Sequence, residues 1–535
     1  MRSRIAPLVL LGVSFFFPKA NLHAQGDHAP ENCAVPASRA ATEEEVEQLR
    51  QEVAGLKAII LHLAAGESEV ASGSARLVPA NAIVDSAQPF APASTPEAVT
   101  LPGMSRPSAG NTTPQKKTVG DPPGVAGWTG EHFRLTSSDG EFTLMPVGYL
   151  NGQYSVYKGD GAPPDTFSIT RARFGVQGNF GKQVDYALLL ESASSITVRD
   201  AFMDFKPWTF FNIAGGQFRV PFSHDVLAPE INYEFNGRTI IGALFPDVSG
   251  GYRAPGLEVY GDLAKGHAQY WFGVFNGQGI LESGTTNEPE YMGRLRFSPW
   301  RQSIHTGLKG FGFGGSIEHS RSKALAGELS FSGVLSDGAY NFFPQFRING
   351  GIDRYDGYFI WLSGPMGLRG EYTQILEKRD NIGPFTPGGI GFNNLPGVVG
   401  KGAYGILTYN LTGENEQEYD TPRVKHPVIG PNSPGETGGP GWGAWQLKLR
   451  YSWLEGRAPG GVCNSTTIPA CPLTPSVVPM YSDHTNQITT GVNWYLNYWV
   501  LVRLDLSIDQ LKNPSVEGIL PRNYFVFSNG LQFRF

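Results

Sequence analysis

The sequence lacks an interior apolar run of about 18 residues, the length that an α-helix needs to cross a bilayer, which excludes helical membrane spans. Charged residues are scarce, at 17%, and the net charge of −6 offers no basic face of the kind that nucleic acids require. The low charge stands beside 68 glycines and 33 phenylalanines, an unusual composition for a soluble multidomain enzyme of 535 residues. A membrane β-barrel is compatible with these values, because apolar and polar residues alternate in its strands and form no long apolar run.

Catalytic motifs are also missing from the sequence. It contains no HExxH, no GxSxG and no phosphate-binding or dinucleotide-binding glycine loop between a strand and a helix. The histidines, such as His62 and His484, are scattered without the spacing of metal ligands. We therefore expect no enzyme activity, no metal site and no cofactor.

The first 24 residues have the pattern of an export signal. Arg2 and Arg4 provide a positive start, and residues 5–17 form a short apolar core. Cleavage near Ala24 is expected, which gives a signal peptide of residues 1–24 and an exported mature chain.

Only three cysteines are present, and in an exported chain they favour a disulfide. Cys463 and Cys471 flank a short segment rich in threonine and proline, so we expect a bridge between them that fastens a long loop. Cys33 is left over, either free or paired with another chain. Residues 29–32 do not form a lipobox, which argues against a lipoprotein anchor.

Residues 41–65 form a charged segment with heptad spacing. The core positions are Val46, Leu49, Val53, Leu56, Ile60 and Leu63. The flanking charges are Glu45 and Glu52 on one side and Arg50 and Lys57 on the other. This pattern predicts a self-associating coiled coil. The alternatives are an amphipathic helix lying on another surface and a tether to another envelope component. Residues 66–127, rich in alanine, proline and serine, are predicted to be a flexible linker.

From residue 128 to residue 535 the apolar residues recur at every second position. In WGAWQLKLRYSW, residues 442–453, the odd-numbered positions from Trp445 are apolar and the even-numbered ones are polar. The chain ends in the same way, on NGLQFRF, with Leu531, Phe533 and Phe535 on one face and Gln532 and Arg534 on the other. Such a pattern predicts antiparallel strands with one face toward an apolar environment.

Two features favour an all-β transmembrane barrel over a soluble sandwich. Aromatic residues lie near strand ends on the apolar faces, as an interfacial belt requires, among them Trp445, Trp453 and Tyr498. Short connections such as Gly181-Lys182 alternate with long ones such as 222–253 and 413–441. We predict a barrel of about 16 strands in the outer membrane, because bacterial barrels close with an even number.

A barrel of this size encloses an aqueous lumen, so the polar face of each strand is where a channel would select its solutes. The cations predicted to point inward are Arg171, Arg173, Arg219, Arg294, Arg296, Arg369, Lys448, Arg450 and Arg503. Guanidinium groups stay charged and pair with oxyanions in a forked geometry, so such a wall favours anions. The alternative is a charge-balanced wall, in a general or weakly cation-preferring porin for small nutrients. Its carboxylates would be Asp185, Glu191, Asp200, Asp204, Glu371 and Asp505.

Several stretches resemble the phosphate-selective porins O and P, in order from about residue 130 to residue 535. They are SITRARFGVQGNFGKQVDYALLLE, ITVRDAFMDFKP and IAGGQFRVPFS, followed by LRGEY, ILTYNLTGE and LKLRYSWLEG. The resemblance implies a 16-stranded, trimeric channel that passes phosphate, polyphosphate or related anions across the outer membrane of a Gram-negative cell. The N-terminal segment would then lie in the periplasm and the barrel would contact outer-membrane lipid.

The resemblance also assigns roles to particular residues. Arg171 and Arg173 match the basic strand pair of the family, and Arg219 matches the basic residue before its Val-Pro-Phe. Phe535 takes the place of the terminal aromatic that the barrel assembly machinery recognises. Residues 222–253 stand where the family folds a loop into the pore. Here that loop departs from the family pattern, because it contains Asp225, Glu230, Glu234 and Asp247 against Arg238 and Arg253.

Overall fold

The structure is a computed structural model. It describes residues 125–129, 132–159, 162–245, 252–277, 279–281, 287–303, 306–326, 347–382, 394–430, 441–459, 480–512 and 523–535. The expected signal peptide, the coiled coil at 41–65, almost all of the linker, Cys33 and the Cys463–Cys471 pair lie outside these residues, so they stay predictions.

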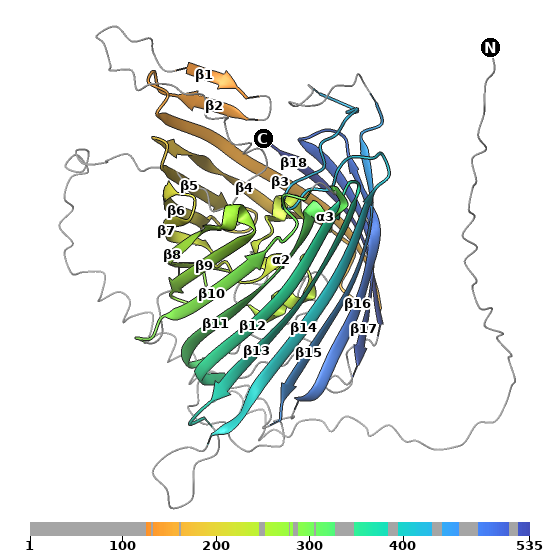
Figure 1. Ribbon diagram of the computed structural model, residues 1–535. Helices are drawn as coiled ribbons and strands as arrows, with labels where there is room; N and C mark the ends of the chain where they lie inside the picture. The colour runs from red at the N-terminus through yellow and green to blue at the C-terminus, as the bar shows by residue number, and fades with distance from the viewer. Residues whose placement is uncertain are drawn as a thin grey trace, which may run out of the picture. The chain divides into compact units, whose positions relative to one another are not determined.

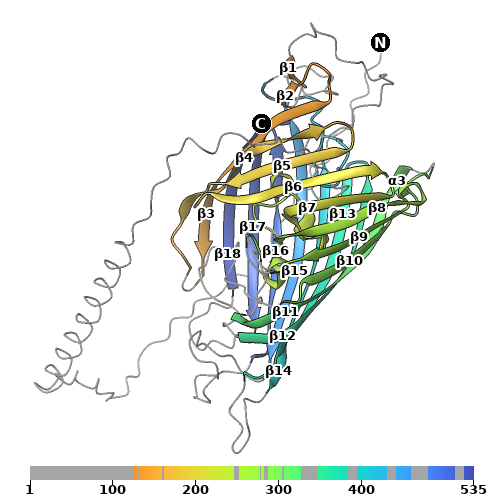
Figure 2. The same ribbon diagram turned by 90° about the vertical axis from the view of Figure 1, so that its left-hand side faces the viewer.

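Sixteen antiparallel strands, β3 to β18, form a closed barrel (Figure 1). Each strand pairs with its neighbour in the chain, and β18 pairs with β3 to close the barrel, as in Phe533 opposite Leu150. Figure 2, turned by 90°, brings the wall of β4 to β9 toward the viewer. The predicted all-β barrel of 16 strands is therefore confirmed.

The barrel strands have these bounds: β3 Phe142–Lys158, β4 Thr166–Phe180, β5 Val184–Glu191, β6 Thr197–Trp208, β7 Phe211–Arg219, β8 Arg253–Leu263, β9 Ala268–Phe275, β10 Glu290–Phe297, β11 Gly310–Ala326, β12 Arg347–Ser363, β13 Met366–Arg379, β14 Leu395–Asn410, β15 Ala444–Ala458, β16 Met480–Tyr495, β17 Val500–Lys512 and β18 Asn523–Arg534. The short helices are α2 His224–Leu227, η1 Glu230–Asn232, η2 Ile240–Leu244, η3 Ala264–Gly266 and α3 Thr306–Lys309. No helix among the described residues is long and apolar enough to span a membrane.

The exposed fractions of the side chains follow the predicted alternation. On β18, Phe527, Leu531 and Phe533 are 43–55% exposed on the outside, whereas Ser528 and Gln532 are 1% exposed on the inside. Apolar residues therefore face outward, which is the arrangement that lipid requires.

A bulge on β4 aims the first two predicted cations inward. Asn151 of β3 pairs with Arg171 and the next residue of β3 pairs with Ile169, so Thr170 is an extra residue in the ladder. Ile169 points outward and is 53% exposed, whereas Arg173, which has the same parity, is 5% exposed inside. A bulge reverses the parity of a strand. Ile169 before the bulge can therefore face outward, while Arg171 and Arg173 after it face inward.

A two-stranded hairpin, β1 (Val125–Trp128) and β2 (Phe133–Thr136), extends the sheet beside β3. Trp128 lies 5.9 Å, ring to ring, from Trp499. The hairpin begins at Val125, three residues inside the range 66–127 that was assigned to the linker. The alternation in so short a segment is too weak to reveal a strand.

The barrel has two different ends. We call one end the turn end. It carries Phe535 and the short connections 181–183, 209–210, 264–267, 364–365 and 496–499. We call the opposite end the loop end. Several exposed tryptophans cluster at the turn end, including Trp208, Trp300 and Trp442. This clustering is typical of an interfacial aromatic belt.

Two details of the sequence-based prediction are wrong, one in the loop pattern and one in the aromatic belt. The long connection 411–443 lies at the turn end rather than with the other long loops, because β14 and β15 meet where Asn410 pairs with Gln446. Tyr498 does not join the outer belt. Its side chain is 4% exposed and its ring lies 3.7 Å from the guanidinium of Arg534 on the inner side.

Candidate pore constriction

The connection from β7 to β8 folds into the lumen. We call its described part, residues 220–245 and Tyr252, the inward loop; it contains α2, η1 and η2, and α2 lies inside the barrel in Figure 1. It reaches the opposite wall, where the backbone N–H of Asn236 donates to Asp505 of β17 at 2.7 Å. The loop that the sequence predicted to turn inward therefore does so, and it narrows the lumen.

The entry to the inward loop is shaped by α2. Ser223 is the N-cap, and its hydroxyl accepts from the backbone N–H of Val226 at 3.1 Å. The carboxylate of Glu371 on β13 accepts from the backbone N–H groups of His224 and Asp225 at 3.0 and 2.9 Å. A carboxylate in this place satisfies helix N–H groups that have no partner within the helix.

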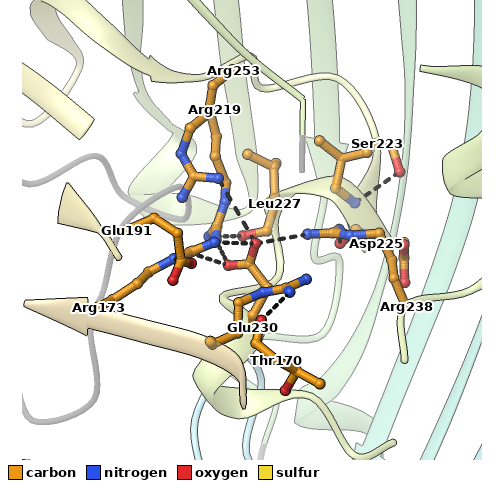
Figure 3. Close-up of polar contacts among 12 residues, drawn as sticks. Thr170, Arg173, Glu191, Arg219, Ser223, Asp225, Leu227, Glu230, Arg238 and Arg253 are labelled. Carbon is orange, nitrogen blue, oxygen red and sulfur yellow. Dashed lines mark hydrogen bonds and ion pairs between the residues drawn. The ribbon is translucent and has the colours of Figure 1, made fainter. Parts of the chain in front are cut away.

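Four arginines surround Glu230 at the start of η1 (Figure 3). Its carboxylate lies 2.7 Å from Arg173, 3.6 Å from Arg238 and 3.9 Å from Arg253, and it also accepts from Arg219. All five side chains are at most 7% exposed. Glu230 therefore ties the inward loop to β4, β7 and β8 at once.

Three more carboxylates complete this cluster. Glu191 accepts from Nε of Arg173 at 2.8 Å. Asp200 accepts two hydrogen bonds from Arg253, at 2.9 and 3.1 Å, and Asp225 lies 3.5 Å from Arg238. The cluster thus holds four arginines and, with Glu230, four carboxylates, and its formal charges cancel.

The electrostatics of the cluster keep Glu230 ionised. Burial by itself would raise the pKa of this carboxyl, but the nearby charges of Arg173, Arg219, Arg253 and Arg238 outweigh it and hold the pKa well below its ordinary value. Because the carboxylate is both charged and surrounded by donors, it is a strong anchor for the loop.

Three cations on β15 and β17 hold the far side of the inward loop. Lys448, Arg450 and Arg503 donate to backbone carbonyls of the loop at 2.5, 2.9 and 3.0 Å. In the same order, the accepting residues are Glu234, Gly237 and Tyr233. Lys448 and Arg450 also lie 4.9 and 4.5 Å from the ring centre of Phe235 in the loop. These cations therefore hold the inward loop against the barrel wall.

The remaining predicted cations contact other lumen groups. Arg296 forms a two-bond pair with Glu418, at 3.1 and 2.8 Å. Arg369 pairs with Glu234 of the inward loop and, at 3.2 Å, with Glu416. Arg294 donates to the hydroxyl of Tyr358 at 2.6 Å.

All nine predicted cations therefore point to the inside, but they are not equivalent. Arg173 and Arg219 meet at Glu230, whereas Arg171 is half-buried at the bulge and donates to the carbonyl of Thr170 at 2.5 Å. The six others lie elsewhere on the wall, and Lys448, Arg450 and Arg503 among them hold the far side of the inward loop. Prediction by parity missed the contributions of Arg253 and Arg534, although Arg534 has the polar parity of the last strand.

The carboxylates proposed as their partners divide into two groups. Glu191, Asp200 and Asp505 pair with Arg173, Arg253 and Lys448, the last at 2.5 Å. Asp185 pairs instead with Lys206, Asp204 accepts from the hydroxyl of Tyr260, and Glu371 caps α2. Asp247 lies outside the described residues.

A small cavity lies beside the Glu230 cluster. Its charged lining consists of Arg173, Arg219, Arg253 and Arg534 with Asp200 and Glu230. Apolar groups from both ends of the barrel sequence, such as Val147 and Phe535, complete the lining. Among the described residues there is no group of three or more His, Cys, Asp or Glu side chains placed to hold a metal ion.

The family follows from the sequence of the barrel itself. A sequence model of phosphate-selective porin O and P matches residues 148–513. The chain belongs to the phosphate-selective porin O and P family. This porin is an outer-membrane channel, and the resemblance seen in its strand sequences is confirmed. No curated protein matches the chain.

Solved structures that are similar to this chain include outer-membrane proteins of three bacteria. A loop L8 deletion mutant of OmpT, an outer membrane protein of Vibrio cholerae, is 11% identical, with a TM-score of 0.46, over 74% of this chain and 100% of that one. An anion-selective porin from Comamonas acidovorans is 14% identical, with a TM-score of 0.45, over 74% and 100%. The outer membrane channel DcaP of Acinetobacter baumannii is 11% identical, with a TM-score of 0.41, over 74% and 97%.

Proposed function

We propose that this porin is a passive diffusion channel for small anions, with phosphate and polyphosphate among them. The observation that carries the proposal is the cavity beside the inward loop, in which four arginines face two carboxylates. Fixed guanidinium groups in a narrow lumen raise the local concentration of anions, and they bind oxyanions in a forked geometry. The family to which the chain belongs supports the same solute class.

The mechanism is steering and filtering, without a chemical step. The inward loop sets the size limit, and Arg173, Arg219 and Arg253 hold it in place while contributing positive charge to the cavity. An anion passes because each fixed charge replaces part of its lost hydration, yet no single group binds it tightly enough to retain it.

A second candidate is a general porin with a charge-balanced lumen. The observation that favours it is the ion pairing around Glu230, where four arginines meet four carboxylates. Fully paired charges leave little field to select a solute.

Solute uptake into proteoliposomes distinguishes the two candidates. Initial influx would be measured for inorganic phosphate, ethylammonium and glycerol, which are similar in size and differ in charge. The anion channel admits phosphate faster than ethylammonium, with glycerol between them. Equal rates for the three solutes, or faster entry of ethylammonium, would instead support the general porin.

We also infer the surroundings of the barrel. The short connections support a periplasmic turn end, and the coiled coil predicted at 41–65 would then lie in the periplasm. A homotrimer is supported by the family resemblance, and the heptads at 41–65 support self-association of the chain. Phe535, whose backbone is hydrogen-bonded to Gly148 at 3.1 and 3.0 Å, is offered at the turn end for recognition by the assembly machinery.

A further inference from the structure

A second segment enters the lumen, from the turn end. We call it the strap and define it as residues 411–430, between β14 and β15. Its backbone is anchored at the rim, where the N–H of Glu416 donates to the carbonyl of Gly364 at 2.7 Å. Farther along, the hydroxyl of Tyr419 donates to the carbonyl of His224 in α2 at 3.0 Å, and the two rings stack with 4.8 Å between their centres. The strap therefore reaches the inward loop.

Acidic residues occupy every second position of the strap from 414 to 420. They are Glu414, Glu416, Glu418 and Asp420. Three of them approach cations of the barrel wall: Glu416 lies 3.2 Å from Arg369, Glu418 lies 2.8 Å from Arg296, and Asp420 lies 4.0 Å from Arg534. The strap thus covers wall cations with its own carboxylates.

The contact between Glu418 and Arg296 has the geometry of a bound anion. Two parallel hydrogen bonds join the carboxylate to the guanidinium, at 3.1 and 2.8 Å, and Nε2 of His224 lies 3.3 Å from the same carboxylate. Arginine receives carboxylate and phosphate oxygens in the same forked way. We propose that Glu418 occupies an oxyanion site formed by Arg296 and His224, and that it competes there with the permeating anion.

Glu418 is better suited to exchange than its neighbour Glu416. The side chain of Glu418 is 21% exposed, whereas that of Glu416 is 2% exposed. Glu416 also accepts from Thr408 at 2.6 Å and from Asn410 at 2.9 Å, which fixes it in the wall. An anion can therefore replace Glu418 at the lumen surface while Glu416 keeps the strap attached.

The competitor carries a full charge. Burial would raise the pKa of the Glu418 carboxyl, but Arg296 and a hydrogen bond with His224 outweigh it, and the pKa lies well below its ordinary value. Glu418 is therefore ionised at neutral pH, and the competition is between two negatively charged groups.

The test is block of chloride current by inorganic phosphate in planar bilayers, with the full-length protein. Glu418→Gln removes the charge and keeps the size of the side chain. We expect half-block at about a five-fold lower phosphate concentration, the effect of one unit charge at ~4 Å in a water-like dielectric. Glu414→Gln is the matched control, because its carboxylate accepts from Thr412 within the strap. It should leave the half-block concentration unchanged.

Three results would overturn the inference: no shift in Glu418→Gln, an equal shift in the Glu414→Gln control, or a shift that persists when Arg296→Gln is added. If Glu418→Gln does not fold, Glu418→Asp replaces it, since the shorter side chain cannot keep both bonds and should also lower the half-block concentration. The inference rests on the proposed anion conduction. Phosphate entry slower than ethylammonium entry through the unchanged protein refutes that conduction, whereas anion conduction without a shift in the variant refutes only the role of Glu418.

Discussion

Replacing Glu230 by glutamine should release the inward loop from the wall. The carboxylate lies within 3.9 Å of Arg173, Arg238 and Arg253 and also contacts Arg219. An amide of the same shape removes the one negative charge that these four guanidinium groups share. Arg219 and Arg238 then retain fewer opposite charges at the place where the loop leaves β7 and turns.

The size of the effect follows from the burial of the cluster. Removing one partner of a buried ion pair costs about 3–5 kcal/mol, because the other charge is left uncompensated. The glutamine keeps one acceptor oxygen, which places the loss near the lower end of this range. A loss of about 3 kcal/mol changes the ratio of docked to released loop by roughly 100-fold.

Single-channel conductance and limited trypsin cleavage after Arg238 measure this release. Glu230→Gln should give a larger, noisier conductance and faster cleavage, while the barrel itself melts at nearly the same temperature. Glu234→Gln is the control in the same loop, because its side chain is 16% exposed and its ion pair is with Arg369. It should weaken the loop less than Glu230→Gln does, because Arg369 keeps Glu416 as a partner. Conductance and cleavage in Glu230→Gln that match those of the control would refute the anchoring role of Glu230.

Three further predictions concern the loop and the N-terminal segment. Gly530→Val should change the conductance, because a Cβ at Gly530 would collide with the side chain of Asn236 at the tip of the inward loop; Gly405→Val, whose Cβ meets nothing within 4 Å, should not. Because the pKa of Glu230 is lowered, its carboxylate stabilises docking of the inward loop above the ordinary pKa of a glutamate, and this contribution is lost only as pH falls through the lowered pKa. Recordings between about pH 8 and pH 5 should therefore show no loosening of the loop that depends on Glu230. Deletion of 41–65 should abolish cross-linked trimers; intact trimers with looser attachment to the envelope would indicate a tether instead.

The faces of the strands could be predicted from the sequence because period two is a local property. Each inward cation, from Arg173 to Arg503, is identified by its immediate neighbours, and lipid demands apolar side chains on the opposite face. For the same reason the terminal strand and its outward-facing Phe535 followed from seven residues.

The partners of these cations could not be predicted from the sequence. Glu230 meets Arg173 from 57 positions away, across a loop whose path depends on the closed barrel. The end at which a connection lies depends on the number of strands before it. A strand count that is uncertain by one therefore cannot show at which end of the barrel the connection 413–441 lies. For this reason the sequence pattern groups it with the long loops of the other end. Tyr498 was misplaced because it lies in the turn 496–499, outside the alternation of β16 and β17.

The most direct test of anion conduction is the reversal potential of the purified full-length porin in a tenfold potassium chloride gradient. The four arginines that line the cavity, Arg173, Arg219, Arg253 and Arg534, predict a potential of the sign that chloride selectivity gives. A potential near zero, or one of the sign that potassium selectivity gives, would contradict it.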